Sequence, residues 1–342
     1  MPALTDPWTL GGIAIPNRVA LAPLAGIGNW FVRLQARRHG AGLVVSEMVS
    51  SFAVHYGNER TCTELLRIHP DERSGGPVSI QLFGSDPDVM RSAAATVAAA
   101  GADLIDLNMG CPVPKVCKTG AGAALISDPD LAVALARAAG EGSGLPITVK
   151  IRSGQRPGDR HGLALARRLV DEAGVAAIAF HPRSAAVGHA GHPDHEMSAE
   201  LVRTLDAPVI LTGGMRSAQA VQSAFEQTGA AAVMLARGAL GNPWLFEQAL
   251  GLRELDPTAD EVLAELDWVI GAAVDHLGAD RAARYLRKFY PWYLARLGAT
   301  PATADALART ESIDEARELL LGAGLAGAGA PRGAARDVAG AL

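Results

Sequence analysis

The sequence predicts an α/β fold, a (β/α)8 TIM barrel, followed by a smaller all-helical domain. Within the first 250 residues, eight short apolar runs alternate with alanine-rich helical patterns. The apolar runs lack polar alternation, which is typical of strands that are buried on both faces in a parallel sheet. Eight strands and eight crossovers in about 250 residues match the size of such a barrel. We therefore expect a barrel domain over 1–250 and a helical domain over 251–322.

The barrel elements are predicted in chain order. A hairpin over 8–15, turning at Gly11 and Gly12, is expected to close the bottom of the barrel. The eight strands are expected at 19–22, 43–47, 78–82, 104–107, 147–151, 177–180, 209–211 and 232–235. Helical patterns between them include 87–99, 129–139, 162–172 and 217–227. The second crossover, 50–76, is irregular, and we expect a long loop with short helices there.

The pattern changes after Leu250. Apolar residues at 262, 266, 269, 270, 273, 274 and 277 fall on one face of a helix. A second helical run covers 286–297, with Pro291 ending or kinking it. A third short helix is expected over 312–321. Residues 323–342 are rich in alanine and glycine, and this composition predicts a disordered tail.

Composition and charge narrow the functional classes. No apolar run reaches the roughly 18–20 residues that span a bilayer, so we expect no membrane segment. Residues 1–6 lack the pattern of a signal peptide, and three cysteines are too few for a disulfide framework. We therefore expect a cytoplasmic protein. The sequence leaves the oligomeric state open, and a monomer is our expectation.

Charge is unevenly distributed in this acidic chain of net charge −5. Residues 253–280 hold eight acids and one arginine, whereas 281–296 hold five basic residues and no acid. Among them, Arg281, Arg284 and Lys288 are spaced to form one stripe on a helix, with Arg287 beside it. Such a stripe can grip the phosphates of a polyanion. The alternative is an ordinary solvated helix face.

The segment around Cys111 is the strongest chemical signal. The apolar run 102–105 leads into Asp-Leu-Asn-Met-Gly-Cys-Pro at 106–112. Gly110 lets the backbone approach a ligand closely, and Pro112 fixes the direction of exit. Since chemistry collects at strand ends in parallel α/β folds, Cys111 is predicted to be a functional thiol. The alternative is a small buried core residue.

Two glycine-rich strand ends are candidates for phosphate binding. Gly213 and Gly214 follow the seventh strand, and Arg237 with Gly238 follows the eighth. Barrels commonly bind phosphate there through exposed backbone N–H groups, and Arg237 adds a cation. Tight strand-to-helix turns are the alternative.

Three further polar side chains end predicted strands. Lys150 would point into the barrel mouth, toward an anion or an electron-rich ring, unless it pairs with Glu47 or Asp106. Gln81 can both donate to and accept from the edge of a heterocycle, or it is an ordinary satisfied amide. His181 can hold a phosphate or a ring oxygen, or it bonds to backbone.

The histidines at 189, 192 and 195 are spaced three apart, as metal ligands on a helix can be. Gly188, Gly191 and Pro193 exclude a regular helix, and neither paired cysteines nor an HExxH motif accompanies them. We expect no metal and a mobile loop over the site. Cys62 and Cys117 lack the strand-end setting and are interpreted as structural.

Together, these segments resemble the flavin-dependent tRNA-dihydrouridine synthase family. The matching stretches lie at 22–26, 81–84, 106–112, 115–122, 148–152, 236–244, 286–288 and 292–293. The resemblance covers roughly residues 8–297. The chain departs from the family pattern at 212–214, with Thr-Gly-Gly for Asn-Gly-Asp, and at 181–185, with His-Pro-Arg-Ser-Ala for His-Gly-Arg-Thr-Arg.

The resemblance implies a site and an activity. It implies that Cys111 is the acid and that Asn108 lies near the uracil. It also implies substrate contacts from Arg183 and from Arg281, Arg284, Arg287 and Lys288. Uridine in tRNA would be reduced, with NADPH recharging the flavin. The implied FMN site comprises Pro23, Leu24, Ala25, Gln81, Lys150, His181, Gly213, Gly214, Ala236 and Arg237.

The chemistry of the residues agrees with this reaction. Saturating the C5–C6 bond of uracil needs a hydride at C6 and a proton at C5, and a thiol with a pKa of about 8.5 is protonated at neutral pH. One alternative is a flavin barrel acting on a free small molecule, such as a dihydroorotate dehydrogenase or an ene-reductase. Another is a non-catalytic RNA-binding regulator.

Overall fold

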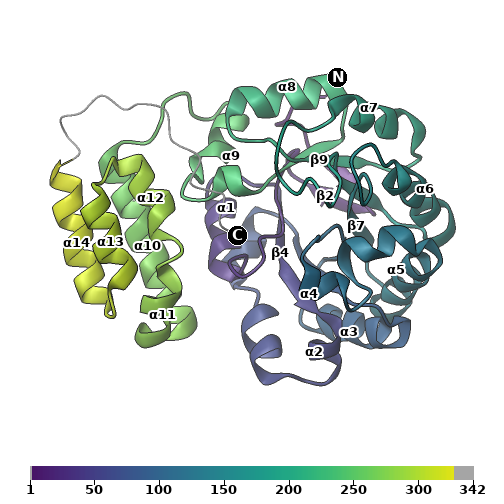
Figure 1. Cartoon of the computed structure of the whole chain (residues 1–342), viewed down its shortest axis with the longest axis horizontal. Coiled ribbons are helices and arrows are strands. Elements are labelled where there is room, and N and C mark those ends of the chain that lie inside the picture. Colours follow the sequence, from purple (N-terminus) through teal and green to yellow (C-terminus); the bar gives the residue numbers. More distant parts are fainter. Residues whose placement is uncertain (1, 327–342) are drawn as a thin grey trace. The chain divides into compact units, whose positions relative to one another are not determined.

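The structure is a computed structural model that describes residues 2–326. The chain forms two compact units, 1–238 and 239–342 (Figure 1). The division precedes the expected break at residue 250. Chain just beyond it already belongs to the second unit, because a Cβ on Gly241 would lie only 2.7 Å from the backbone of Trp292.

The first unit is a closed parallel barrel of eight strands, as predicted. The strand order is β10-β3-β4-β5-β6-β7-β8-β9, so each strand pairs with its neighbours in sequence and the last pairs with the first. The strands are β3 (Val19–Leu21), β4 (Leu43–Ser50), β5 (Val78–Phe83), β6 (Leu104–Met109), β7 (Ile147–Arg152), β8 (Ala177–His181), β9 (Val209–Thr212) and β10 (Ala232–Leu235).

Strand β4 is longer than expected and irregular. Its register against β5 shifts between Val45 and Met48, so a bulge interrupts the ladder where the sequence pattern predicts its end. Within the bulge, the Glu47 N–H donates to Gly28 O and the Ser46 hydroxyl bonds to backbone. Bulges re-aim side chains next to functional sites, and this one separates Ser46 and Glu47 from the regular pleat.

Helices surround the barrel and confirm the four ranges expected between strands to within a few residues. The main ones are α1 (Trp30–Arg38), α3 (Pro87–Ala99), α5 (Pro129–Ser143), α6 (His161–Ala173), α7 (His195–Thr204) and α8 (Ala218–Thr228). Short elements are α2 (Ser51–His55), α4 (Pro114–Cys117), the π-helix η1 (Thr61–Leu65) and the 3-10 helices η2 (Pro70–Gly75), η3 (Gly122–Ser127) and η4 (Arg237–Ala239). The irregular crossover after β4 thus consists of short helices, as predicted.

The predicted hairpin closes the bottom of the barrel. Strands β1 (Trp8–Leu10) and β2 (Ile13–Ile15) are antiparallel, and the turn needs the positive φ angles of Gly11 and Gly12. A Cβ on Gly11 would lie 2.4 Å from Pro146, just before β7, so the turn packs under the N-terminal ends of the strands. Leu10 and Ile15 are fully buried in one apolar cluster with the aliphatic residues of the barrel strands.

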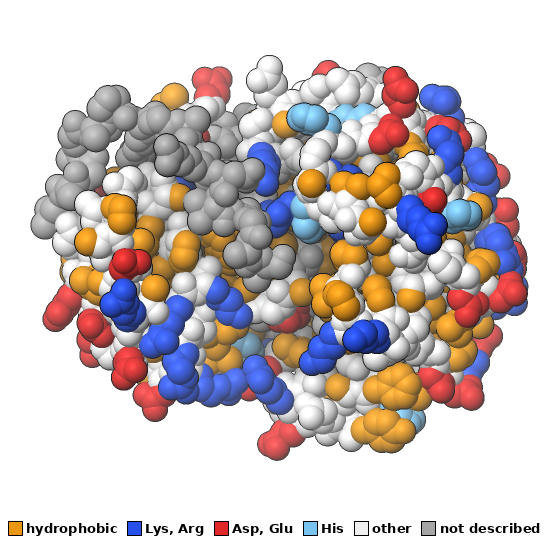
Figure 2. Space-filling model, viewed as in Figure 1, with side chains coloured by type: hydrophobic (Ala, Val, Ile, Leu, Met, Phe, Trp, Pro, Cys, Tyr) orange, Lys and Arg blue, Asp and Glu red, His pale blue; other side chains and the backbone are white. Residues whose placement is uncertain are grey.

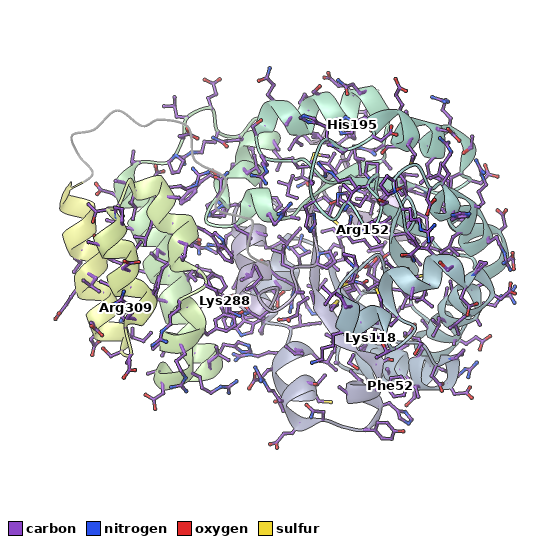
Figure 3. The ribbon with its side chains drawn as sticks, in the orientation of Figure 1. Phe52, Lys118, Arg152, His195, Lys288 and Arg309 are labelled. Atoms are coloured by element: carbon purple, nitrogen blue, oxygen red, sulfur yellow. The ribbon has the colours of Figure 1, made fainter. Side chains whose placement is uncertain are left out.

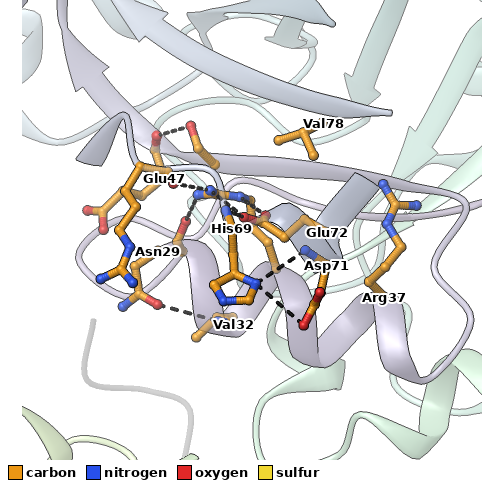
Figure 4. A network of polar contacts seen from close by, with 12 residues as sticks. Asn29, Val32, Arg37, Glu47, His69, Asp71, Glu72 and Val78 are labelled. Carbon is orange, nitrogen blue, oxygen red and sulfur yellow. Dashed lines mark hydrogen bonds and ion pairs between the residues drawn. The ribbon is translucent and has the colours of Figure 1, made fainter. Parts of the chain in front are cut away.

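A buried ion pair ties the irregular crossover to helix α1. Arg33 Nε lies 2.7 Å from Glu72 Oε1, and both side chains are fully buried. Arg33 also donates to Arg67 O at 2.7 Å and to Gly28 O at 3.2 Å, while Glu72 accepts the His69 N–H (Figure 4). The pair therefore holds η2, the chain before it and the β3–α1 loop together.

The second unit consists of helices. They are α9 (Trp244–Ala249), α10 (Ala259–Leu277), α11 (Ala279–Leu286), α12 (Tyr290–Leu297), α13 (Pro301–Arg309) and α14 (Ile313–Ala326). Helix α10 starts with a capping box between Thr258 and Glu261 and confirms the predicted apolar face. Helix α13 was not predicted, although Thr300 as N-cap and Pro301 in the first turn are a recognisable start signal.

The second predicted helix of this unit is two helices. Helix α11 ends at Leu286, a turn follows, and Pro291 lies in the first turn of α12, where its missing N–H costs no hydrogen bond. Helix α14 continues to Ala326 and so includes the first four residues of the range expected to be a disordered tail. Residues 327–342 lie outside the described residues. Among the described helices, none combines the length and apolarity needed to cross a membrane.

Candidate active site

The neighbouring strands β5, β6 and β7 carry a buried hydrogen-bond network between their side chains. Asp106 accepts from Gln81 Nε2 through Oδ2 and from Thr148 Oγ1 through Oδ1, both at 2.6 Å. Gln81 Oε1 accepts from Asn108 Nδ2 at 2.9 Å. These side chains meet because Gln81, Asp106 and Thr148 are paired across the three strands in register. Burial raises the pKa of Asp106, and the two donors oppose that rise.

The network ends on the loop that carries Cys111. Asn108 Oδ1 accepts the N–H of Cys111 at 2.9 Å and that of Gly110 at 3.3 Å. The Cys111 carbonyl in turn accepts from Ala123 N at 3.0 Å and from the Cys117 thiol at 3.3 Å. Cys111 is thus held by hydrogen bonds on both sides of its own backbone.

The Cys111 side chain is a free thiol and is partly buried. Burial raises its pKa above the ordinary value; the backbone N–H of Val113 and the cations Arg152 and Lys150 oppose this, and Cys117 adds to it. Lys150 has the smallest of these influences on the thiol. At neutral pH the group carries its proton and can donate it.

Cations gather at the ends of the next strands. Lys150 keeps a little of its surface exposed, but desolvation, followed by the nearby Arg152, lowers its pKa to about 8. Burial, together with the positive Arg183 and Arg237, lowers the pKa of Arg152 to about 10. Burial, followed by Arg237 and Arg216, likewise lowers the pKa of Arg183. Mutually repelling cations at one end of a barrel favour an anionic ligand.

Arg152 has the additional role of a brace. Its Nε donates to Gly110 O at 2.9 Å, and its Nη1 donates to Ser184 O and Gly188 O. It therefore joins the Cys111 loop to the loop after β8, deep within the barrel unit (Figure 3). The sequence interpretation missed this role. The one feature of the sequence that could have indicated it is the spacing of Arg152, which lies two residues after Lys150 and therefore on the same face of β7.

His181 and Gly213 form a tight contact at the ends of β8 and β9. His181 is buried, and burial, together with the nearby cations, lowers its pKa far below the ordinary value. Its Nε2 lies 3.1 Å from Arg183 Nη1; a guanidinium only donates, so Nε2 is the unprotonated nitrogen. Gly213 has φ +109°, and a Cβ there would lie 2.5 Å from the imidazole.

Arg183 does not present its charge outward. Besides contacting His181, its Nε donates to Ala190 O at 3.0 Å and its Nη2 donates to Gly191 O. The side chain is buried and holds the loop after β8 in shape. The contact between Arg183 and substrate that the resemblance implies stays a prediction, and the hydrogen bonds of this side chain to Ala190 O and Gly191 O serve the loop itself.

The remaining predicted cofactor residues lie in the loops after β3, β9 and β10. Pro23, Leu24 and Ala25 follow β3, where Gly28 N donates to Leu24 O at 2.7 Å and Gly26 N donates to Glu47 Oε2 at 2.8 Å. Gly214 has φ +78°. Ala236 and Arg237 follow β10, and Arg237 opens η4. The barrel thus brings all of the predicted cofactor residues to the ends of its strands.

The basic residues of the helical unit do not form a single helical stripe. Arg281 and Arg284 are exposed on α11, but Lys288 lies in the turn after it, with its Nζ 4.0 Å from the Tyr285 ring centroid. Arg287 bonds to Thr310 O through Nε at 3.0 Å and Nη2 at 2.6 Å, at the end of α13. The predicted stripe is wrong because the helix breaks, although Lys and Arg still gather along one edge of this unit (Figure 2).

The histidines that are spaced three apart have different partners and do not form one cluster. His189 stacks on His181 at 5.7 Å between centroids, and burial, followed by Arg237, lowers its pKa to about 4. His195 starts α7 and its Nδ1 contacts Gln227. Within residues 2–326, no group of three or more His, Cys, Asp or Glu side chains could hold a metal ion.

Comparison with known proteins decides the family. The family model described as dihydrouridine synthase (Dus) matches residues 20–322, most of both units. The chain belongs to the dihydrouridine synthase family. It is 35% identical over 302 residues to a Pseudomonas aeruginosa protein named tRNA-dihydrouridine synthase B, covering 84% of this chain and 87% of that protein.

Other relatives support the same membership. The chain is 32% identical over 320 residues to a Synechocystis protein named probable tRNA-dihydrouridine synthase 1, covering 92% and 88% of the two chains. Among solved structures, a morphinone reductase variant in complex with tetrahydroNAD is similar, with a TM-score of 0.58 at 15% identity over 77% of this chain and 94% of the other. The old yellow enzyme homologue from Zymomonas mobilis gives 0.56 at 16% over 75% and 94%. These two confirm the barrel fold alone.

Proposed function

We propose that this member of the dihydrouridine synthase family reduces the C5–C6 bond of uridines in tRNA. The observation that carries the proposal is the position of Cys111, whose backbone N–H is held by Asn108 on the loop after β6 and whose thiol lies within the influence of the cations Arg152 and Lys150. The family match reaches residue 322 and so includes the helical unit. That extent favours tRNA over a free small molecule as the substrate.

The residues present fit an anionic flavin such as FMN. Lys150, Arg152 and Arg237 supply positive charge around the ends of β7 and β10. Gly213 leaves open the space that a Cβ would fill beside His181, and the neutral imidazole retains an N–H on Nδ1. Pro23, Leu24, Ala25, Gln81, Gly214 and Ala236 would complete the site. When bound and reduced, FMN supplies the hydride for C6, and NADPH is the proposed reductant.

Cys111 is the proposed proton donor. A thiol whose pKa lies above its ordinary value is protonated throughout the neutral range, so it can give a proton to C5 of uracil. The nucleotide must leave its stack to reach a barrel end, as in other enzymes that modify bases. Asn108 holds the Cys111 loop through its side-chain oxygen and is the proposed neighbour of the uracil.

The proposed RNA contact of the helical unit is smaller than the sequence predicted. Arg281 and Arg284 on α11, together with Lys288, are exposed and can bind phosphates. Arg287 is left out, because its guanidinium group bonds to a backbone carbonyl. A monomer and a cytoplasmic location stay predictions.

The test is a comparison of Cys111→Ala with Cys62→Ala. Both thiols are free and partly buried, but Cys62 lies in η1, outside the strand-end loops. We expect Cys111→Ala to keep its flavin and its oxidation of NADPH while losing dihydrouridine formation in tRNA by about 100-fold or more, the weight of a general acid. Cys62→Ala should behave as the unmodified chain. Full activity of Cys111→Ala would remove the proposed acid.

A further inference from the structure

The hydrogen bonds between the side chains of β5, β6 and β7 all run the same way: each donor points along the chain of groups toward Asp106. The bonds run from Thr148 and Gln81 to Asp106, from Asn108 to Gln81, and from the Cys111 N–H to Asn108. Each of the two amides, Gln81 and Asn108, could be turned by 180° in isolation. In the structure, both turn their nitrogen toward Asp106 and their oxygen toward Cys111.

The two ends of the network impose this direction. A backbone N–H such as that of Cys111 can only donate, and an ionised carboxylate can only accept. Gln81 must therefore offer its NH2 to Asp106, which leaves its oxygen for Asn108 Nδ2. Asn108 then has its oxygen left for the Cys111 N–H. If Asp106 took a proton on Oδ1, the Thr148 hydroxyl would accept it, and Oδ2 would still accept from Gln81.

We infer that Asp106 is a positioning residue for Cys111, acting through Gln81 and Asn108. It does so from a rigid place, since it is almost fully buried and paired in register with Gln81 and Thr148. The inference rests on the proposed role of Cys111 as proton donor. It goes beyond that role by assigning the orientation of the thiol loop to a carboxylate two positions from Asn108 on the same face of β6.

Loss of the acceptor at 106 would free both amides. Gln81 would keep a buried NH2 without its partner, so the acceptor that fixes the orientation of its amide would be gone and the amide could turn. In the turned orientation its NH2 points toward Asn108. The NH2 of Asn108 would then face the NH2 of Gln81, so Asn108 would have to turn as well. Its NH2 would then point at the Cys111 N–H, and two donors would face each other. The loop would lose the bond that holds Cys111, and its thiol would become more accessible.

The experiment measures the alkylation of Cys111 by iodoacetamide at pH 8 in the flavin-loaded full chain, with Cys62 as internal reference. Asp106→Leu removes the acceptor at similar size, and we expect alkylation of Cys111 to rise by about threefold to tenfold, the weight of one hydrogen bond. Asp106→Asn should restore the slow rate, because its oxygen can accept from Gln81 while its NH2 donates to Thr148. No effect of Asp106→Leu, or an Asp106→Asn variant as fast as it, would overturn the inference.

A double-mutant cycle tests the path. If Asp106 acts through Asn108, adding Asp106→Leu to Asn108→Ala should change alkylation no further, whereas additive effects contradict the inference. Should Asp106→Leu not fold, Gln81→Met breaks the same chain and should give the same rise. Asp103→Leu, at the other end of β6, is the matched control and should leave Cys111 unchanged. Since alkylation needs no tRNA, its result stands apart from any failure to form dihydrouridine.

Discussion

Removing the charge of Glu72 should destabilise the barrel unit strongly. In Glu72→Gln, the buried guanidinium of Arg33 loses the partner that its Nε and Nη2 contact at 2.7 and 3.2 Å. Its contacts to Arg67 O and Gly28 O remain, but backbone carbonyls are neutral and do not compensate the charge. An uncompensated buried charge costs about 3–5 kcal/mol. In addition, the His69 N–H donates to Glu72 Oε2 at 2.7 Å in the unmodified protein. In Glu72→Gln, the NH2 of the new amide can take the place of Oε2, and two donors would then face each other.

The assay is thermal unfolding of the full chain, followed by circular dichroism. At about 2–4 °C per kcal/mol for a unit of this size, Glu72→Gln should lower the melting temperature by roughly 10 °C. The control is Glu141→Gln, whose partner Arg91 lies at 2.7 Å but is 44% exposed; that change should cost about 1 kcal/mol or less. Equal shifts for the two variants would refute the reasoning that burial makes the Arg33–Glu72 pair essential.

The barrel was predictable because its signals are local. Eight apolar runs, with glycine and proline between them, identified every strand, and Gly11 with Gly12 identified the hairpin. The Arg33–Glu72 pair was not predictable, because 39 residues separate two charges that only the folded crossover brings together. The bulge at Ser46 was hidden as well, since a strand with an extra residue has the same apolar composition as a regular one.

The site was predictable as a set of strand ends but not as a network. Cys111, Lys150 and His181 could be placed because each follows an apolar run. The direction of bonding from Asn108 to Asp106 depends on the register between strands, which no single-sequence pattern fixes.

Three further predictions concern the site and the helical unit. Gly213→Ala should reduce flavin retention and lower the melting temperature more than Gly12→Ala, because both have positive φ but only at Gly213 would the Cβ strike a side chain; equal losses would exclude the contact. In the cofactor-free protein, Lys150 has a pKa of about 8 against 10.5 when unfolded, so its charge opposes folding fully below pH 8 and ceases to do so by about 10.5. Lys150→Met should therefore raise the free energy of unfolding at pH 7, with a gain that shrinks across that window in urea titrations; a gain independent of pH would contradict this. Arg287→Ala should destabilise the helical unit by about 1–3 kcal/mol in the same titrations, whereas Arg284→Glu should leave stability unchanged and weaken tRNA binding with a smaller salt dependence.

The cations at the end of the barrel couple the binding of an anion to the stability of the fold. Lys150, Arg152 and Arg183 lower one another's pKa or that of His189, so the protein without an anion holds repelling charges close together. A bound phosphate relieves that repulsion, and binding and stability are therefore coupled. Folding stability should then rise with flavin concentration, and the rise should be largest where these groups remain charged, below about pH 8. The repulsion among these cations destabilises the protein when no anion is bound, and a bound anionic cofactor removes that repulsion.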